Sequence, residues 1–242
     1  MINGKQLKDA ISFVKKGIDI RKSMFDYDGV FLVFSEGKGG VYVSSSFMSV
    51  VYSSFIPCTG VSDRELAIPK FRTTPLYNLP DDDIDIVTGY DFIKFHETRI
   101  LTQTPPAHRN ILKEIDNTSD FRYVSIDRVN ALYYLMETKN GRKGVNFNIG
   151  VSATAGSVTL TKKQKHSKLD TESVSCECTG DLGRVDAVVG FSPLLCAVEA
   201  IAAVGAQSIM IGMSNRPKTT VIVRHGESPN FFCILRREWS LS

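Results

Sequence analysis

Apolar residues along the chain recur with a helical period in some segments and a strand period in others. Residues 4–20 carry an apolar stripe at intervals of three or four residues, which predicts an amphipathic helix. The stripe consists of Leu7, Ile11, Val14 and Ile18. Two runs rich in β-branched and aromatic residues follow at 29–34 and 39–57, with turn residues at 36–39 between them. This order predicts a helix followed by paired strands.

A second group of elements is predicted between residues 65 and 104. A short strand at 65–68 leads to Pro69, which suits the first turn of a helix. Pro75 must shorten or kink that helix, because proline lacks the N–H that a helix interior requires. Three segments that alternate apolar and polar residues come next and predict strands. They are 83–87, 91–97 and 99–104.

The same order recurs in the second half of the chain. A strand at 122–126 leads into a predicted helix at 127–138, whose apolar face is expected to hold Ile126, Val129, Leu132, Tyr133 and Met136. Later strands are predicted near 145–150, 156–162, 173–179, 185–190, 208–213, 219–224 and 230–237. A helix is predicted at 191–206, with Ser192 as its N-cap and Pro193 at its first position.

A unit of strand, helix and three strands therefore repeats four times, at intervals of about 60 residues. We predict an α+β protein of two domains, each with two helices packed on antiparallel sheets. The domains are expected at residues 1–104 and 121–242. The connector between them is expected at 105–120, where two adjacent prolines and polar residues favour a linker.

Composition excludes several classes of protein. Of the 242 residues, 43% are hydrophobic and 23% are charged, which is typical of a folded globular protein. No run approaches the roughly 18 apolar residues of a membrane helix, and the N-terminal segment is too polar for a secretory signal. The five cysteines have no regular spacing, and Cys176 and Cys178 lack further ligands for a metal. We expect reduced, buried thiols in a cytoplasmic protein, with no metal and no cofactor.

The octet VIVRHGES at 221–228 raises the possibility of an enzyme. It resembles the Arg-His-Gly of histidine phosphatases, in which the histidine accepts a phosphoryl group. That chemistry needs further His and Arg ligands later in the chain, but no histidine follows His225. The next residues, Gly226 and Ser228 to Asn230, are typical of a turn. We therefore predict no enzymatic activity, and expect His225 to be exposed and without function in a hairpin between the last two strands.

Three stretches resemble the DNA polymerase sliding clamp, or processivity factor, family. They are LAIPKFRTTPLYNLPDDDIDIV (66–87), FSPLLCAVEAIAAVGAQSIMIGM (191–213) and NFFCILRR (230–237). The resemblance implies the DNA clamp fold and covers nearly the whole chain as a pattern. Two domains resemble the trimeric clamps of eukaryotes, archaea and T-even-type bacteriophages. Because the first helix begins almost at the N-terminus, the phage clamps are the most similar.

The resemblance implies a non-enzymatic ring that encircles duplex DNA and tethers the replicative polymerase. The implied partners are double-stranded DNA of any sequence, a DNA polymerase, a clamp loader and further copies of the chain as a homotrimer, without a membrane. If the chain is encoded by a phage, the expected location is the cytoplasm of the bacterial host. The net charge of +3 is too small to indicate DNA binding by itself.

Basic residues on the helices are the candidates for contact with DNA in the pore of such a ring. They are Lys5, Lys8, Lys15, Lys16, Lys70, Arg72 and Arg128. A lysine-rich face is more often only solvated, and the repeat architecture is what favours the DNA contact. The last helix carries one charge, Glu199, so the pore cannot be uniformly positive. On a clamp the acids Asp81, Asp82, Asp83, Asp85 and Asp91 are expected on the outer side, apart from the basic helices.

The family also implies a hydrophobic pocket that captures short peptides of replication proteins. Alternation places Phe232 and Ile234 on one face of the last strand, at the positions of the family pocket. Val43 and Met48 match its wall from the first domain, and Ile111, Leu112 and Ile115 are residues that the connector could add. Ordinary core packing is the competing interpretation for each of them.

A different class of protein also fits a chain rich in strands. A viral structural or assembly protein could use the same strands for subunit packing. It would have no DNA-tethering role and no peptide pocket.

Overall fold

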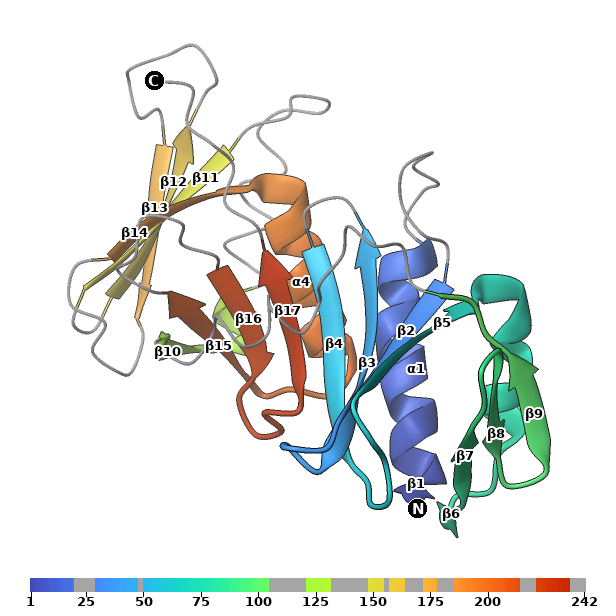
Figure 1. Cartoon of the computed structure of the whole chain (residues 1–242). Coiled ribbons are helices and arrows are strands. Elements are labelled where there is room, and N and C mark those ends of the chain that lie inside the picture. Colours follow the sequence, from blue (N-terminus) through green and yellow to red (C-terminus); the bar gives the residue numbers. More distant parts are fainter. Residues whose placement is uncertain are drawn as a thin grey trace. The chain divides into compact units, whose positions relative to one another are not determined.

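The computed structural model describes residues 1–19, 29–47, 50–104, 121–131, 148–154, 157–163, 172–177, 185–213 and 221–235. The chain divides into two compact units, Met1–Asp116 and Asn117–Ser242. This division falls in the predicted connector, residues 105–120, which lie outside the described residues. Figure 1 shows the elements, and each unit is considered separately below.

The first half of unit 1 is a helix packed on a four-stranded antiparallel sheet. Its elements are β1 (Ile2–Asn3), α1 (Gly4–Asp19), β2 (Gly29–Ser35), β3 (Gly40–Phe47), β4 (Val50–Pro57) and β5 (Arg64–Pro69). The order within this sheet is β4-β3-β2-β5, with α1 lying across it (Figure 1). The helix predicted at residues 4–20 and the turn predicted at 36–39 are confirmed.

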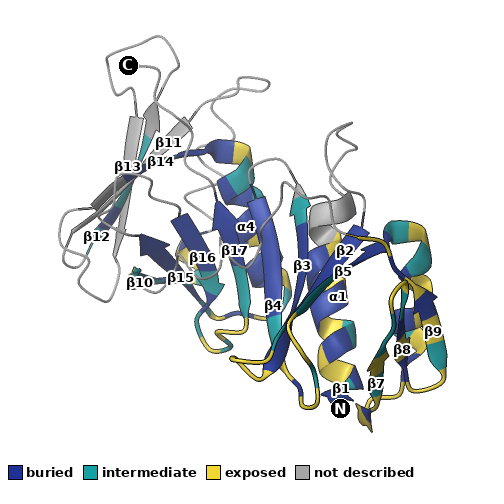
Figure 2. Ribbon diagram, in the orientation of Figure 1, coloured by how far each residue is buried: buried dark blue, intermediate teal, exposed yellow. Residues whose placement is uncertain are grey.

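The buried face of α1 forms the core of unit 1. Leu7, Ile11 and Val14 of the predicted stripe are fully buried. Phe13 is also buried, and its ring meets Tyr52 of β4 edge-on, with 6.3 Å between ring centroids. A fully buried side chain of this kind contributes about 1.5–3 kcal/mol relative to its exposed state. In Figure 2 the sheet beneath α1 is correspondingly dark blue, while exposed residues gather on loops and on the free face of the helix.

The predicted second helix of unit 1 is reduced to two short turns of 3-10 helix. These are η1 (Lys70–Arg72), which begins after Pro69, and η2 (Thr74–Asn78), which has Pro75 in its first turn. Thr73 separates them, and both its N–H and its hydroxyl donate to the carbonyl of Lys70. Pro75 cannot donate a main-chain hydrogen bond, so the backbone restarts there instead of continuing as an α-helix.

Unit 1 is completed by four short strands. They are β6 (Asp83–Ile84), β7 (Ile86–Thr88), β8 (Phe92–Phe95) and β9 (Thr98–Leu101). Strands β7, β8 and β9 form an antiparallel meander, and β6 pairs with β1. Unit 1 therefore does open with a strand before its helix, although that strand has only two residues.

Unit 2 contains two four-stranded antiparallel sheets. Its elements are β10 (Arg122–Asp127), β11 (Asn148–Thr154), β12 (Ser157–Lys163), β13 (Glu172–Glu177), β14 (Val185–Gly190), α4 (Phe191–Ala203), β15 (Ser208–Met213), β16 (Val221–His225) and β17 (Phe231–Leu235). One sheet has the order β10-β15-β16-β17 and the other the order β13-β12-β11-β14. The four repeats begin at Ile2, Arg64, Arg122 and Val185, about 60 residues apart, which confirms the predicted repeat.

Two predictions about helices in unit 2 are wrong. Helix α4 begins at Phe191 with Gly190 as its N-cap, so Ser192 lies inside the first turn and caps nothing. Val129 is 71% exposed and does not belong to a buried face, although Ile126 is buried. The helical turn at 128–131 begins after Asp127, whose carboxylate accepts the N–H groups of Val129 and Asn130. Leu132, Tyr133 and Met136 lie outside the described residues.

Helix α4 is largely buried. Eight of its residues are buried, among them Leu194, Val198 and Ile201, which agrees with the apolar composition of this segment. Glu199 is the one charged residue in the helix, and it is exposed. No helix within the described ranges is long and apolar enough to cross a bilayer.

Candidate functional site

The exposed face of α1 carries most of the predicted DNA-binding residues. Lys5, Ser12 and Lys15 are exposed on this face, and Lys8 is partly exposed between them. Their spacing of three, four and three residues aligns them along one side of the helix, opposite the buried stripe. Lys16 belongs to the same helix, but its side chain lies outside the description. The structure therefore brings together three of the predicted lysines in one row.

Two of these lysines contact the segment that follows η2. The Lys8 ammonium donates to the Leu79 carbonyl at 2.9 Å and pairs with the Asp81 carboxylate. The Lys15 ammonium lies 5.4 Å from the centre of the Tyr77 ring, in a cation–π contact. The lysine row is therefore held from one side by residues 77–81.

The acidic segment, residues 81–85, meets the N-terminus of α1. Its main chain accepts the first helical N–H groups: Gly4 donates to Asp82 and Lys5 donates to Asp81. The Asp83 carboxylate accepts from the Asn3 side chain at 3.1 Å. Negative charge is favourable at this end of a helix, where N–H groups lack partners within the helix. The expected separation of the acids from the basic helix is therefore wrong for Asp81.

Lys8 and Lys5 affect the charge of Asp81. The hydrogen bond and the positive charge of Lys8 lower the pKa of this carboxyl, and Lys5 lowers it further. Asp81 therefore carries its negative charge throughout the neutral pH range. At the N-terminal end of α1, the net positive charge of the lysine row is smaller than the sequence suggested.

The remaining predicted basic residues are more scattered. Lys70 and Arg72 of η1 are both half-buried. The Arg72 guanidinium donates to the Leu101 carbonyl of β9 at 3.2 Å and lies 5.1 Å from the centre of the Phe71 ring. Arg128 is half-buried in unit 2, and its backbone N–H donates to the Gln207 carbonyl.

The predicted pocket residues of unit 2 share one face of its sheet. Phe232 and Ile234 pair with Arg224 and Ile222 of β16, on the opposite face from Cys233. Burial raises the pKa of the Cys233 thiol, and Cys196 of α4, on the other face from Phe232, raises it further. Phe232 is half-buried, whereas Ile234 is fully buried. Only Phe232 of the pair offers exposed surface.

The predicted pocket residues of unit 1 are not exposed in the described part of the chain. Val43 is fully buried and lies on the same face of β3 as Ser45, whose hydroxyl donates to the Val14 carbonyl of α1. Val43 is therefore packed in the core beneath the helix. Met48, Ile111, Leu112 and Ile115 lie outside the described residues.

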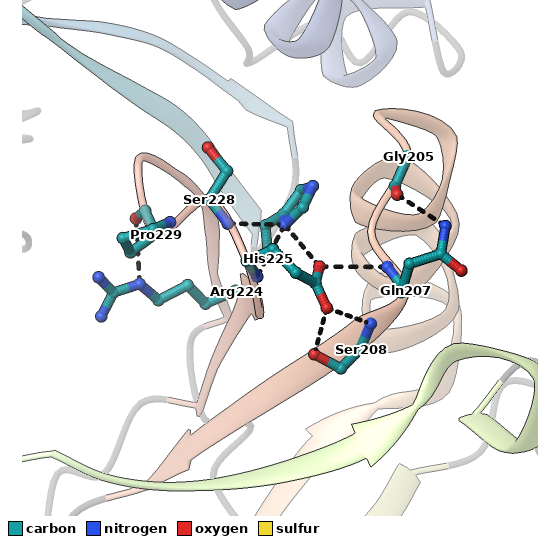
Figure 3. Close-up of polar contacts among 8 residues, drawn as sticks. Gly205, Gln207, Ser208, Arg224, His225, Ser228 and Pro229 are labelled. Carbon is teal, nitrogen blue, oxygen red and sulfur yellow. Dashed lines mark hydrogen bonds and ion pairs between the residues drawn. The ribbon is translucent and has the colours of Figure 1, made fainter.

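The octet 221–228 contains all of β16 and the start of the turn to β17, as predicted. The prediction that His225 is exposed is wrong, since only 6% of the residue is accessible. Its Nδ1 accepts the N–H groups of Glu227 and Ser228 at 3.2 and 3.0 Å. Figure 3 shows the contact with Ser228. A nitrogen that accepts two N–H donors carries no proton, so the proton of the neutral ring is on Nε2. The 3.2 Å approach of the Glu227 carboxylate to Nδ1 becomes an ion pair only when the ring is protonated.

The other polar residues of the octet also have structural partners. The Glu227 carboxylate accepts the Gln207 and Ser208 N–H groups and the Ser208 hydroxyl. The Arg224 guanidinium donates to the Pro229 carbonyl (Figure 3). A Cβ atom at Gly226 would lie 1.9 Å from the Ser208 hydroxyl oxygen, so glycine is required there. Glu227 thus fastens the hairpin to β15, while Arg224 contacts the turn itself.

Glu227 gives this hairpin a measurable dependence on pH. Its hydrogen bonds, led by that from Ser208, lower the pKa of the carboxyl from 4.5 to about 2. The stabilisation is complete above pH 4.5 and is lost as the pH falls toward 2, because protonation removes the acceptor. Glu227→Gln should therefore unfold at lower urea concentration than wild type at pH 7, and the difference should vanish between pH 4.5 and 2. A difference that stays constant over that range would contradict the assignment; Glu97→Gln, at another exposed turn, is the control.

Some of these contacts could not be found from the sequence. Lys8 and Asp81 are separated by 73 positions, and they meet only because the segment around Asp81 packs on the N-terminus of α1. The position of Glu227 beside turn residues places it in the hairpin. Its role as a hydrogen-bond acceptor could not be predicted, because its donor Ser208 on β15 lies 19 residues earlier in the sequence.

Two units, each with helical segments packed on antiparallel sheets in the order of a fourfold repeat, define the DNA sliding clamp fold. No protein-family model and no curated protein matches the chain. Solved clamp structures do match. The DNA polymerase III subunit beta of Pseudomonas aeruginosa superimposes with a TM-score of 0.72 at 11% identity, covering 98% of this chain and 65% of that one.

Two further structures give the same result. The DNA polymerase sliding clamp of Caulobacter crescentus has a TM-score of 0.72 at 11% identity, with 98% of this chain and 64% of that one covered. A protein from Eubacterium rectale ATCC 33656 described as a DNA polymerase III beta subunit has a TM-score of 0.69 at 15% identity, with coverage of 98% and 64%. The chain therefore has the fold of these clamps and spans about two thirds of their length.

Proposed function

We propose that this protein is a DNA sliding clamp that encircles duplex DNA as a ring and tethers a DNA polymerase. The observation that carries the proposal is the clamp fold across 98% of the chain, with exposed lysines aligned on α1. Lysines that meet phosphates through salt-screened contacts suit a protein that must hold DNA of any sequence and still move along it. A clamp loader and a replicative polymerase are the partners that such a ring requires.

Lys5 and Lys15 are the strongest candidates for contact with phosphate. Both are exposed on α1, and a cation–π contact with Tyr77 leaves the Lys15 ammonium free to donate hydrogen bonds. Lys8 contributes less, since Asp81 already neutralises it. Lys16, Lys70, Arg72 and Arg128 are secondary candidates on or next to the other helical segments.

We propose that the protein is not an enzyme. The one motif with catalytic character is the octet, and its histidine is buried with Nδ1 already occupied. Its role is to shape the hairpin that carries Phe232. Phosphatase activity in the wild-type protein, abolished by His225→Ala, would contradict this.

Two edge strands could close a ring between copies of the chain. Strand β9 is an edge strand of the sheet β7-β8-β9, and β13 is an edge strand of the sheet β13-β12-β11-β14 in unit 2. Thr102 N–H points toward β8, so alternation directs the N–H groups of Arg99 and Leu101 outward. An edge strand that presents outward N–H groups can add a strand from a second chain, and at Leu101 the Arg72 guanidinium would have to release the carbonyl that it now contacts. A neighbour's β13, which contains Glu172 and Glu177, has the opposite charge to Arg99.

The surface beside β9 is also apolar. Phe71 is 75% exposed and Leu101 is 46% exposed, and the Arg72 guanidinium contacts both residues. Repeated head-to-tail contacts of this kind close into a ring when the rotation between copies allows it. With two units per chain, we propose a homotrimer with six clamp-type units, as in the T-even-type phage clamps, acting in the cytoplasm of a bacterial host.

Phe232 is the proposed entrance of a pocket for partner peptides. It is half-buried beside Arg224, on the sheet face opposite α4. Ile234, which is fully buried on the same face of the strand, would form the floor of this pocket. An aromatic anchor in an apolar pocket is a usual arrangement for capture of short peptides.

Light scattering on the eluting protein tests the assembly directly. We expect a mass three times that of the 26.8 kDa chain at micromolar concentration. A strict monomer up to about 100 µM would contradict ring formation, because edge pairing of three copies with apolar flanks should be stable at that concentration. A large or open-ended assembly would instead favour the viral structural alternative.

A further inference from the structure

The Lys8 ammonium is largely occupied before any DNA arrives. An ammonium group has three donors, and one of them goes to the Leu79 carbonyl while another goes to the Asp81 carboxylate. The Lys8 side chain is 24% exposed, whereas Asp81 is 66% exposed and lies on the outer side of the pair. A negatively charged group that approaches Lys8 from solvent is therefore also repelled by the Asp81 carboxylate.

The main chain fixes the position of Asp81 relative to α1. Its carbonyl accepts the Lys5 N–H, and the next carbonyl, of Asp82, accepts the Gly4 N–H at 2.9 Å. A Cβ atom at Gly4 would lie 2.0 Å from the Pro80 carbonyl oxygen, so this close approach depends on glycine. Strand pairing of Asn3 with Asp83 holds the other side of the segment. The carboxylate is thus presented to the lysine row by fixed backbone.

We propose that Asp81 is a resident counter-ion that competes with DNA phosphate for Lys8. This inference rests on the proposed function and adds a residue that weakens the DNA contact. A phosphate near Lys8 must displace Asp81 or accept its repulsion, so each chain makes a weaker contact at this point. Lys5 attracts Asp81 by its charge but forms no ion pair with a described carboxylate, and Lys15 has no such partner either, so both keep more of the attraction to DNA. The result is a row of cations with graded strength, which suits movement along a duplex.

The test replaces the carboxylate with its neutral isostere. Asp81→Asn keeps the backbone contacts to Lys5 and removes only the charge. Binding of a fluorescent linear duplex of about 24 base pairs, which can thread a closed ring, is measured by anisotropy in the full chain. We expect the affinity to rise about threefold to tenfold at roughly 50 mM salt and to fall more steeply with added salt, because each chain gains one phosphate contact. The added contact should increase the salt slope by about 0.9 for each chain that touches DNA.

Two comparisons separate this effect from a general change in charge. Asp91→Asn removes an exposed carboxylate of the same unit that has no ion pair with α1 in the described residues, so it should change the affinity less than twofold. In a Lys8→Met background, Asp81→Asn should lose most of its effect, since there is no longer an ammonium to release. Equal effects of Asp81→Asn and Asp91→Asn, or an undiminished effect without Lys8, would overturn the proposal and leave the clamp function intact.

A different outcome identifies failure of the proposed function itself. If neither wild type nor Asp81→Asn binds the duplex at any salt concentration, the DNA-binding role fails and the counter-ion role fails with it. The contact between the two side chains can be checked without DNA, by NMR titration of the Asp81 carboxyl. Its pKa should be lower than usual in wild type and should rise in Lys8→Met.

Discussion

Replacing Lys5 and Lys15 with glutamate should weaken binding of a short DNA duplex by about 100-fold or more at low salt. Each chain changes by four charges, so in the proposed trimer six cations of the proposed pore become six anions. Each lost phosphate contact reduces both the affinity and its dependence on salt concentration. Stimulation of the cognate polymerase on primed DNA should be lost with it. Anisotropy with a linear duplex across a range of salt concentrations measures the effect.

The choice of these two lysines follows from the structure. Both are exposed, so glutamate should leave the fold intact. A glutamate at Lys8 would instead face the Asp81 carboxylate and disturb the segment that docks on α1. The matched control is Lys38→Glu with Lys94→Glu, which changes the charge equally on the 36–39 turn and on β8. Equal DNA binding by the α1 variant and the control would contradict the assignment of the α1 face.

If the chain forms the proposed ring, Leu101→Pro should convert it to monomers at micromolar concentration. Proline removes the outward N–H of β9, and its ring occupies the place where a neighbouring strand would pair. The hydrogen bonds of β9 to β8 should survive, because they come from Thr98, Ile100 and Thr102 on the inward side. We expect the dissociation constant of the proposed ring to rise by about 100-fold or more, since an outward main-chain donor and an exposed apolar side chain of β9 are both lost.

Leu101→Ala is the matched control for this variant. It removes the exposed side chain and keeps the N–H group, so it should weaken assembly less than the proline does. Analytical ultracentrifugation over a concentration series gives both constants. If Leu101→Pro assembles as well as wild type while its circular dichroism is unchanged, β9 is not the edge that closes the ring.

The sequence was sufficient for elements determined by local pattern. The stripe of Leu7, Ile11 and Val14 predicted α1, and turn residues between alternating strands predicted the β16–β17 hairpin. Both signals are local, because an amphipathic period and a tight turn need only neighbouring residues. The fourfold repeat also predicted the fold, because it fixes the order of helices and strands along the chain.

Contacts between distant segments could not be predicted in the same way. Nothing local to Lys8 indicates that Asp81 neutralises it, and nothing local to His225 indicates that it is buried. A polar residue next to a turn is usually exposed, but here the imidazole satisfies two N–H groups of its own turn. At Val129 the apolar period was misleading, because the helical turn begins at the surface after Asp127. These errors concern burial, which depends on the whole fold.

The candidate site shows the same division. Alternation correctly paired Phe232 with Ile234 on one face of the last strand, because this is a local property of a strand. It could not show that Ile234 and Val43 are fully buried, since that depends on residues packed across the sheet. Placement of lysines on the exposed face of α1 was predictable, whereas their partners Tyr77 and Asp81 were not.

Electron microscopy of the wild-type particle tests the central claim most directly. A homotrimer of chains with two clamp-type units each should appear as a ring with six lobes and a central hole wide enough for a DNA duplex. Class averages of purified protein at micromolar concentration, with Leu101→Pro as a control that lacks rings, would show this. Particles without a hole, or assemblies that extend as filaments or shells, would contradict the sliding clamp.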